Sequence, residues 1–599
     1  MEKQKTRAEI EEKYKWDLST IFKTENDFLY YYNKIKNEIN KIDNYKGEIT
    51  KSPKNLYTFL NLSDDLERKL YKLYYYAHLK FDEDTTLVNS QKNYNLVNNL
   101  LDNYNQKTSF VVPELLEISY DKILDYINEY PKLNDYKFNL ECIYRYKNHT
   151  LDKKSEELIS NFSKVLSNPE ESYSALVDSD MTFGTIKVDG KEVELTSSNY
   201  SLYIRSDNRD IRKEAFNLLH QKYADFKNTI TTNFKGNIEG IIKLAKIKNF
   251  NSTIESALFK DNISIDIYDN LINTINDNLN ISYKYFDLKK KCLGLDELHN
   301  YDLYAEMVFD SSKKYSFEDA KKLVLEALKP LGEDYIEILN KAFNERWIDV
   351  YNNKGKRSGA YSSGFYDTNP FLLLNFEGKL DDVSTLAHEL GHSVHTYYSC
   401  KNNTYNNSSY KIFVAEVAST VNELLLAKHL LKNSKDDNEK CYILNQLMEL
   451  FKATIYRQVM FAEFERDIHK KMEDGEPLTH ESISNYYYDL NKKYFGDTVK
   501  LDDLIRYEWE RIPHFYYNFY VYKYAIGLSS ACLIVENILS GKDKNAENYK
   551  KFLKSGGSDY PANELKLANV SVESKELIES AVKMFDEFIE EFRKIKNVK

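Results

Sequence analysis

The chain has 599 residues, of which 42% are hydrophobic and 30% are charged. Together with a mean hydropathy of -0.62, this composition predicts a folded, water-soluble protein and excludes a disordered or membrane-embedded chain. A formal net charge of -11 argues against nucleic acid as the main partner.

The sequence carries no signal for a membrane or for an oxidising compartment. It contains no apolar run long enough to cross a bilayer, and its first residues, MEKQKTRAEI, lack the apolar core of a signal peptide. The five cysteines are scattered, odd in number and never in C-x-x-C pairs, so neither a disulfide framework nor a cysteine zinc site is indicated. We therefore expect a cytoplasmic protein with no membrane partner.

The first part of the chain has the pattern of a helical domain. From residue 6 to about 180, apolar residues and tyrosines recur every three or four positions, which predicts a succession of helices. No residue pattern in this part suggests chemistry. The clearest predicted helices lie at 25–42, 53–81, 90–106, 113–128 and 155–166.

A change of pattern follows, where apolar residues alternate on both sides of Asp189-Gly190. This is the signal for a β-hairpin with a type I′ turn. After it, Ser206-Asp207 is expected to cap a long helix that runs to Lys248. Helical patterns then continue at 264–294 and 316–341.

Short β-rich runs begin at Trp347 and are separated by Gly and Asn; they are WIDVY, AYSSGFY and NPFLLLNF. They predict a small sheet immediately ahead of the next helix. Such a sheet has a free edge, to which an extended peptide could add as a further strand through the backbone of Gly359, Ala360 and Tyr361. A purely structural hairpin is the alternative.

The most informative stretch is 381–395, DDVSTLAHELGHSVH, which contains His388-Glu389-x-x-His392. Residues four apart lie on the same face of an α-helix, so both imidazoles can bind one metal ion. Glu389 lies about 100° round the helix, close enough to reach a water on that metal without being a ligand. The alternative is a chance match on a buried helix, but only on the order of 0.02 such matches are expected in this chain.

The residues around this motif also favour a helix. Asp381, Asp382 and Ser384 suit a helix N-terminus, and the apolar residues between them and the histidines give the helix a face to bury. Gly391 costs about 1 kcal/mol relative to alanine inside a helix. This cost is easier to understand if another backbone or a substrate passes close to Gly391.

A zinc ion that activates water needs a third protein ligand and an open fourth position. The helical pattern at 412–432 supplies Glu416, a single acid among apolar residues, whose burial is costly unless it is paired or binds a metal. Glu423, seven residues further on, could orient a ligand histidine. His395 is the alternative third ligand, and Glu416 is preferred to it.

A long helix is predicted at 442–472, and an aromatic stretch, RIPHFYYNFYVYKY, follows at 511–524. Pro513 suits a helix start, which places His514 in an N-terminal turn. Imidazole and phenol donors aimed at a cleft can stabilise the oxyanion that forms when a carbonyl is attacked. An ordinary buried aromatic stripe is the alternative. The tyrosines concerned are Tyr516, Tyr517, Tyr520, Tyr522 and Tyr524.

Taken together, these motifs resemble the zinc metallopeptidases of the thimet oligopeptidase-like family, and within it the oligoendopeptidase F group. The resemblance rests on TLAHELGHSVH, FVAEVASTVNE, YRQVMFAEFE and HFYYNFYVYKY, which all lie between residues 385 and 524. The opening KWDLSTIF is also similar to that group, so the likeness extends over the whole length.

The resemblance implies a mostly α, prolate, two-lobed molecule with a deep central channel and a small β-sheet next to the zinc helix. We expect an N-terminal helical lobe at 1–200 and a catalytic domain at 201–599, interleaved around the channel. The family implies one zinc ion and an endopeptidase that hydrolyses short unstructured peptides rather than folded proteins. The oligomeric state and the cleavage-site preference are not predicted.

Matched position by position, the resemblance implies that His388, His392 and Glu416 bind the zinc and that Glu389 is the general base. Glu389 would take a proton from the attacking water and later pass it to the leaving amine. The same resemblance makes the region of His514 an oxyanion site.

The tyrosines of that oxyanion site are assigned by their spacing. Relatives of the thimet type have a glycine-containing loop between the histidine and the first tyrosine, with a second tyrosine seven residues later. This chain has HFYY with no glycine at that point. Tyr517 and Tyr524 preserve the seven-residue spacing and are the expected pair, with Tyr520 as the reserve.

Two other functions are considered beside the endopeptidase. The first is a non-catalytic peptide-binding protein with a structural zinc, although structural zinc sites are normally closed by four protein ligands and seldom have a carboxylate at the position of Glu389. The second is an exopeptidase that trims the ends of peptides.

Overall fold

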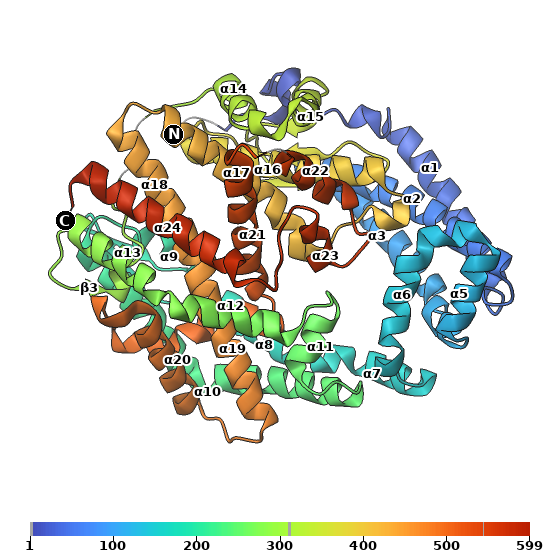
Figure 1. Cartoon of the computed structure of the whole chain (residues 1–599), viewed down its shortest axis with the longest axis horizontal. Coiled ribbons are helices and arrows are strands. Elements are labelled where there is room, and N and C mark those ends of the chain that lie inside the picture. Colours follow the sequence, from blue (N-terminus) through green and yellow to red (C-terminus); the bar gives the residue numbers. More distant parts are fainter. Residues whose placement is uncertain (1–3, 309–312, 543, 599) are drawn as a thin grey trace. The chain divides into compact units, whose positions relative to one another are not determined.

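The computed structural model describes residues 4–308, 313–542 and 544–598. Its elements are mostly helices, and the strands of the described residues form three small sheets (Figure 1). The predicted mostly α fold, with a small sheet beside the His-Glu-x-x-His helix, is confirmed. No helix of the described residues combines the length and the apolar character needed to cross a bilayer.

The chain divides into two compact units, each assembled from three stretches. The first unit consists of Met1–Asn148, Lys313–His429 and Ile534–Val570, and the second of His149–Ser312, Leu430–Leu533 and Ser571–Lys599. These units are defined by packing and not by activity. The division into a lobe at 1–200 and a catalytic domain at 201–599 therefore remains a prediction.

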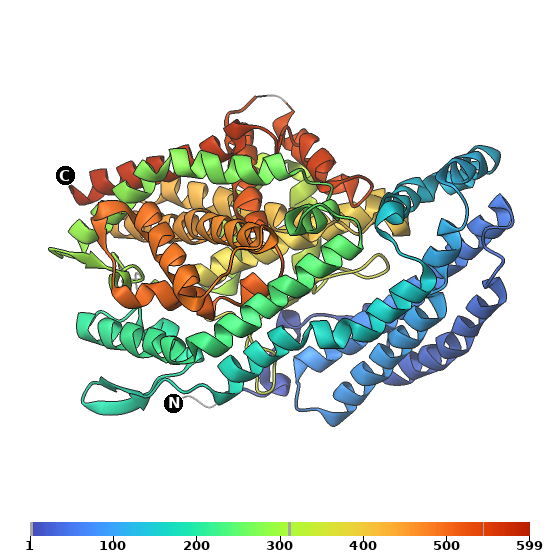
Figure 2. The same ribbon diagram turned by 90° about the horizontal axis from the view of Figure 1, so that it is seen from below.

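The first unit begins with helices that pack around α2. Helix α2 starts where the Ser52 side chain accepts a hydrogen bond from the Asn55 N–H, with Pro53 in its first turn. Helices α1 and α3 pack along α2, and the three lie side by side in Figure 2 (blue). The helices of this part are α1 (Glu25–Glu38), α2 (Pro53–Glu83), α3 (Val88–Thr108), α4 (Val111–Leu116), α5 (Tyr120–Glu129) and α6 (Lys137–Arg145).

The single helix predicted at 113–128 is wrong, because the structure has two helices there, α4 and α5. The break falls at Ser119, whose side chain accepts a hydrogen bond from the Lys122 N–H and so caps a new helix. The apolar spacing continues through this cap, so periodicity alone does not reveal it.

The predicted small sheet has three strands in the order β4-β6-β5. Strand β6 lies in the middle, parallel to β4 and antiparallel to β5, with Ser362 opposite Leu372. Among the described residues β5 pairs on one side only, so it is an edge strand. Its strands are β4 (Ile348–Asp349), β5 (Tyr361–Ser363) and β6 (Phe371–Leu373).

Buried charged groups fix this sheet within the first unit. Asp349 on β4 is buried and binds the Nζ of Lys356 at 2.7 Å and a guanidinium nitrogen of Arg7 at 2.6 Å. Asp82 on α2 accepts a hydrogen bond from the Tyr361 hydroxyl at 2.7 Å, which holds β5. The other helices of the unit are α14 (Phe317–Ala327), α15 (Glu333–Asn344), α16 (Leu380–Asn402), α17 (Ile412–Asn433, in this unit as far as His429), α22 (Asn545–Ser555) and α23 (Pro561–Lys566).

The second unit contains the predicted hairpin, β1 (Thr185–Val188) and β2 (Lys191–Glu194), seen in teal at the lower left of Figure 2. Asp189 and Gly190 both have positive φ, as the predicted type I′ turn requires. Strands β3 (Leu298–His299) and β7 (Val499–Lys500) form a second small sheet.

The helices of the second unit largely follow the predicted pattern. The long helix α10 is capped by Asn208 rather than by the predicted Ser206-Asp207, because the Asn208 side chain accepts the Asp210 N–H. The segment predicted as one helix at 442–472 is α18 and α19 joined by a π-helical turn at Lys452–Tyr456. Its helices are α7 (Lys153–Leu166), α8 (Asn168–Ala175), α9 (Ser197–Tyr203), α10 (Arg209–Ile247), α11 (Thr253–Phe259), α12 (Ile265–Asp277), α13 (Leu279–Cys292), α18 (Asp437–Phe451), α19 (Arg457–Glu473), α20 (His480–Phe495), α21 (Tyr522–Leu539, in this unit as far as Leu533) and α24 (Lys575–Lys596).

Candidate metal centre and active site

Helix α16 carries the His-Glu-x-x-His motif and begins at Leu380. Its start is fixed by Asp382, whose carboxylate accepts hydrogen bonds from the N–H groups of Glu377 at 3.0 Å and Lys379 at 2.8 Å. Val383, Leu386 and other apolar residues of one face are fully buried. The predicted helix, with acidic residues in its first turn, is confirmed.

Helix α17 crosses α16 in close backbone contact at Gly391. A Cβ added there would lie 2.6 Å from the Ala418 carbonyl oxygen and 2.6 Å from the Ser419 Cα. The expected close approach of another backbone is therefore confirmed. The buried Asn422 fixes the register of the two helices, because its amide donates to the Ala387 carbonyl at 3.0 Å.

This crossing places a carboxylate of α17 beside both histidines of α16. The Glu416 Oε2 lies 3.5 Å from the His388 Nε2 and 3.6 Å from the His392 Nε2. One ligand atom from each of the three residues lies within 4.8 Å of the others, as a shared ion requires. Ligand atoms bound at about 2.0–2.1 Å to a tetrahedral zinc lie roughly 3.4 Å apart, so the donor set and its spacing fit such an ion.

Neighbouring carboxylates set the charge of this group. Burial lowers the pKa of His388, but the hydrogen bond to Glu423 and the charges of Glu423, Glu389 and Glu416 together outweigh burial and raise the pKa to about 9. That contact joins the His388 Nδ1 to the Glu423 Oε1 at 3.3 Å, which leaves Nε2 facing Glu416. The hydrogen bond from His392 lowers the pKa of Glu416 to about 2, so this carboxylate is ionised at neutral pH.

Glu389 is buried beside the two histidines, on the side where α16 meets strand β5. Burial raises its pKa, while the charges of His388 and His392 oppose that rise. The backbone of Ser362 on β5 also hydrogen-bonds the Glu389 carboxylate. The Ser362 hydroxyl lies 2.8 Å from that of Ser393, whose own hydroxyl donates to the Glu389 carbonyl at 3.0 Å. Strand β5 is thus tied to the helix at Glu389.

The alternative ligand His395 is not part of this group. It is fully buried, and its ring stacks on that of Tyr410 with the centroids 3.7 Å apart. Burial lowers its pKa to about 3, so it is neutral. His395 therefore acts as a packed core residue, and the geometry favours Glu416.

In the second unit, His514 lies among the three tyrosines considered with it. Its ring centroid is 5.7 Å from that of Tyr517, 6.3 Å from that of Tyr520 and 6.0 Å from that of Tyr524. The Tyr524 hydroxyl lies 3.4 Å from the His514 Nε2. Tyr517 is the most exposed of the three. All three rings face His514, so these distances do not select one pair of tyrosines.

The loop after His514 makes its turn without glycine. Asn518 and Phe519 both have positive φ, the left-handed conformation that non-glycine residues rarely adopt. The Phe519 N–H donates to the buried carboxyl of Glu465 at 2.6 Å, and burial raises the pKa of Glu465 to about 8. This buried contact holds the turn at Asn518 and Phe519.

Two family models match the chain. The model of peptidase family M3 matches residues 202–584, and the model of oligopeptidase F matches residues 114–183. The chain belongs to peptidase family M3. It is therefore a metallopeptidase, and peptides are its substrates.

Curated and solved relatives agree with this M3 membership. The chain is 42% identical over 590 residues to oligopeptidase PepF of Bacillus subtilis, covering 98% of this chain and 88% of the relative. It is 38% identical to group B oligopeptidase PepB of Streptococcus agalactiae, covering 98% of both chains. The crystal structure of a putative peptidase from Chlamydophila abortus matches with a TM-score of 0.92 at 36% identity, covering 99% of this chain and 100% of that one. Oligoendopeptidase-F from Enterococcus faecium gives a TM-score of 0.74 at 32% identity, covering 96% and 99%. The resemblance to the oligoendopeptidase F group is confirmed.

In this M3 peptidase, some residues hold the proposed metal ligands and Glu389 in place without belonging to the group, and the sequence did not predict them. Ser362 and Ser393 connect β5 to Glu389, and Asn422 sets the register of α17 on α16. A serine in a short strand carries no periodic signal. Asn422 could have been found, since it is a lone amide in an apolar helix, six residues after Glu416.

Proposed function

We propose that this M3 peptidase is a zinc-dependent endopeptidase that hydrolyses internal bonds of short, unstructured oligopeptides. The observation that carries the proposal is the convergence of His388, His392 and Glu416 with the buried carboxyl of Glu389 beside them. The names of the relatives, oligopeptidase and oligoendopeptidase F, support the substrate class. The cytoplasmic location expected from the sequence remains a prediction.

The proposed metal ligands are His388, His392 and Glu416, and Glu423 orients His388 by holding its Nδ1–H. When bound, a zinc ion at this group would polarise a carbonyl oxygen and lower the pKa of a water molecule bound to it. The three side chains are each partly exposed, which leaves room for water and substrate on one side.

Glu389 is the proposed general base. Its carboxylate would accept a proton from the water that attacks the scissile carbonyl and would then donate this proton to the leaving amine. The hydrogen bond from the Ser362 backbone holds the carboxylate in one orientation, which favours proton transfer along a fixed path.

His514 is the proposed donor to the oxyanion, together with Tyr517 and Tyr524, and Tyr520 is the reserve. Each such donor contributes roughly 2.7–4 kcal/mol of transition-state stabilisation where it has been removed by mutation. Burial lowers the pKa of His514, so the ring donates as a neutral imidazole at neutral pH.

Strand β5 is the proposed guide for the substrate backbone. It is the edge of its sheet among the described residues, it adjoins α16, and its Ser362 touches Glu389. An extended peptide added to this edge would run past Glu389 with its backbone groups paired. Of the expected Gly359, Ala360 and Tyr361, only Tyr361 lies in β5. Gly359 has a φ of 85°, and its carbonyl accepts a hydrogen bond from the Asn375 side chain at 2.8 Å, so it is not part of an extended edge.

The variant Glu389→Gln tests the proposed function. It should retain zinc, because Glu389 is not a proposed ligand, and should lose hydrolysis of an internally quenched peptide by about 10²–10⁴-fold. The peptide is blocked at both ends, so that only cleavage of an internal bond gives a signal. Zinc content is measured by metal analysis on the same samples.

Three outcomes would refute parts of the proposal. If the zinc-loaded Glu389→Gln variant hydrolysed the peptide as fast as the wild type, Glu389 would not be the general base. Cleavage of free-ended peptides only would identify an exopeptidase. Undiminished hydrolysis after complete removal of zinc by a chelator would refute the metal-dependent scheme.

A further inference from the structure

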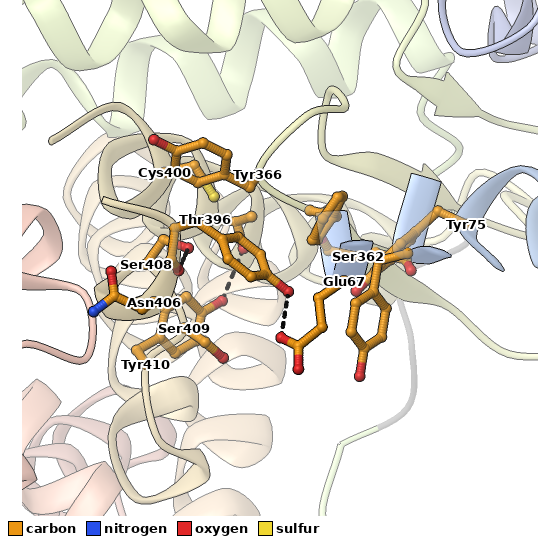
Figure 3. Close-up of a pocket in the computed structure, with 15 residues that line it drawn as sticks. Glu67, Tyr75, Ser362, Tyr366, Thr396, Cys400, Asn406, Ser408, Ser409 and Tyr410 are labelled. Atoms are coloured by element: carbon orange, nitrogen blue, oxygen red, sulfur yellow. Dashed lines mark hydrogen bonds between the residues drawn. The ribbon is translucent and has the colours of Figure 1, made fainter. Parts of the chain in front are cut away.

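A cavity of about 580 Å³ opens in the first unit beside the candidate metal centre (Figure 3). Its walls come from helix α2, from strand β5 with the residues that follow it, from the C-terminal half of α16 and from the loop after α16. The size is within the usual range of small-molecule binding sites. Nothing in the scheme above uses this cavity.

The cavity shares two residues with the surroundings of the metal group. Ser362, whose backbone hydrogen-bonds Glu389, also lines the cavity. Thr396, another lining residue, follows His392 by one helical turn, about 6 Å along the axis. The cavity therefore adjoins the path proposed for a peptide along β5 past Glu389.

Glu67 of α2 supplies the only acidic side chain of the cavity wall in the described residues. Figure 3 shows its carboxylate projecting from α2 toward the loop after α16. It accepts hydrogen bonds from the hydroxyls of Tyr104 at 3.0 Å and Tyr405 at 3.2 Å. Burial raises its pKa and the two phenols oppose this rise, with no contribution from a basic residue. Among the described residues, the hydrogen-bond partners of this carboxyl group are thus phenols and not basic side chains.

The basic residue next to Glu67 in the sequence is already neutralised. Arg68 forms two hydrogen bonds to Asp367, at 2.9 and 2.6 Å, and its guanidinium lies 4.9 Å from the ring centroid of Tyr366. The thiol of Cys400, which also lines the cavity, has its pKa raised to about 11 by burial and stays neutral. Glu67 is therefore the one described lining residue that can supply a negative charge, and no described lysine or arginine lines the cavity to oppose it.

Aromatic rings form much of the remaining wall. Phe365 packs against Tyr71, Tyr75 and Tyr405, with ring centroids 5.5, 5.6 and 5.8 Å apart. Aromatic faces attract cations, and Tyr366 already does so for Arg68. An aromatic wall around one carboxylate suits the guanidinium or ammonium of a basic side chain, whose methylene stem packs on the rings.

We infer that this cavity is the subsite for an arginine or lysine side chain of the substrate peptide, with Glu67 as its counter-ion. The inference rests on the proposed function, since it assigns the cavity to a peptide bound at the same centre. Glu67 is a specificity-determining residue in this scheme and takes no part in the proton transfers at Glu389.

The test uses zinc-loaded protein and internally quenched peptides that are blocked at both ends. One position at a time carries arginine, its neutral isostere citrulline, or glutamate. We expect arginine to give roughly ten- to a hundredfold higher kcat/KM than citrulline at one fixed position relative to the cut, as for a hydrogen bond to a charged group. In Glu67→Gln this ratio should fall to about one.

Asp65→Asn is the matched control. Asp65 lies on the same helix and carries the same charge, but it is exposed and pairs with Lys69 outside the cavity. The variant should keep the wild-type preference for arginine. Three results would overturn the inference. The wild type could show no preference for arginine, Glu67→Gln could keep the preference, or Asp65→Asn could lose it too. The wild type could also hydrolyse a citrulline peptide with a free N-terminus as fast as the blocked arginine peptide. That result would assign the cavity to the terminal ammonium and would overturn the inference as well.

A binding measurement separates this inference from the proposed function. Calorimetry on Glu389→Gln and on the double variant Glu67→Gln/Glu389→Gln uses the same arginine and citrulline peptides without cleavage. Tighter binding of arginine that depends on Glu67 supports the subsite even if no variant of the protein hydrolyses peptides. Equal Kd values for the two peptides on Glu389→Gln would refute the subsite even if the wild type is an active endopeptidase.

Discussion

Glu423 acts on the proposed metal centre without being one of its ligands. Its Oε1 lies 3.3 Å from the His388 Nδ1, so the ring presents Nε2 toward Glu416 and the proposed ion. A carboxylate in this position fixes the tautomer of the histidine and makes it a stronger ligand. His392 has no such partner among the contacts described, so the two histidines should contribute unequally to metal affinity.

The variant Glu423→Gln is predicted to weaken zinc binding by roughly tenfold to a hundredfold, because a neutral amide orients His388 but supports its basicity less. Zinc affinity is measured by competition with a chelator of known affinity. Glu326→Gln on α14, an exposed position in the same unit, is the control and should bind zinc like the wild type. Unchanged affinity in Glu423→Gln would mean that His388 is held by its packing alone.

At the scale of elements, the contact between α16 and α17 positions the third proposed ligand. Glu416 belongs to α17, and its distance from the histidines depends on how closely that helix approaches Gly391. The buried hydrogen bond from Asn422 to Ala387 prevents the helices from sliding. The geometry of the metal group is therefore a property of this helix pair and not of α16 alone.

The variant Gly391→Ala is predicted to weaken zinc binding and to lower the free energy of unfolding by about 1–3 kcal/mol, as overpacking does. The new methyl would lie 2.6 Å from the Ala418 carbonyl oxygen, so α17 must move away and take Glu416 with it. Zinc affinity and denaturant unfolding measure the two effects.

Gly527→Ala is the matched control for this prediction. Gly527 lies inside helix α21, and a Cβ there would meet nothing within 4 Å. Because alanine favours a helix over glycine by about 1 kcal/mol, this variant should be as stable as the wild type or more so, with unchanged zinc affinity. If Gly391→Ala behaved like Gly527→Ala, the close contact would not position Glu416.

These elements also explain how far the sequence could predict the site. His388, Glu389 and His392 share one helix, so their spacing alone reveals them, and Glu416 stands out as an acid in an apolar helix. The cavity of Glu67 is built from four separate parts of the chain, none of which has a local signal. The tyrosine register near His514 was not predictable either, because the turn is made by Asn518 and Phe519 rather than by glycine.

At the scale of the whole molecule, buried carboxyl groups link stability to pH. Burial raises the pKa of Glu510 to about 9 and that of Glu564 to about 8, as it does for Glu465. Opposite cases exist, since Arg457 holds the pKa of the buried Glu508 at about 2 against the effect of burial. A carboxyl group whose pKa is raised by folding stabilises the folded state at low pH. A carboxyl group whose pKa is lowered by folding stabilises it above the ordinary pKa of the group.

Glu510 gives the sharpest prediction of this kind. It is almost completely buried, and neither of its carboxyl oxygens has a hydrogen-bond partner among the described residues. Its folded-state pKa of about 9 lies above the ordinary value of 4.5, so the unfolded chain releases a proton at lower pH than the folded one. Between these two values the group therefore lowers the free energy of unfolding by about 1.4 kcal/mol for each unit of rising pH.

The variant Glu510→Gln should lose this dependence, because glutamine does not ionise. When the pH rises from 6 to 8, the free energy of unfolding of the variant should increase by about 2.7 kcal/mol relative to that of the wild type, because only the wild type loses this stability. Denaturant unfolding of both proteins at the two pH values measures this difference. Glu326→Gln, exposed to solvent, is the control and should follow the wild type. A difference between Glu510→Gln and the wild type that stays constant with pH would show that Glu510 is ionised in the folded protein.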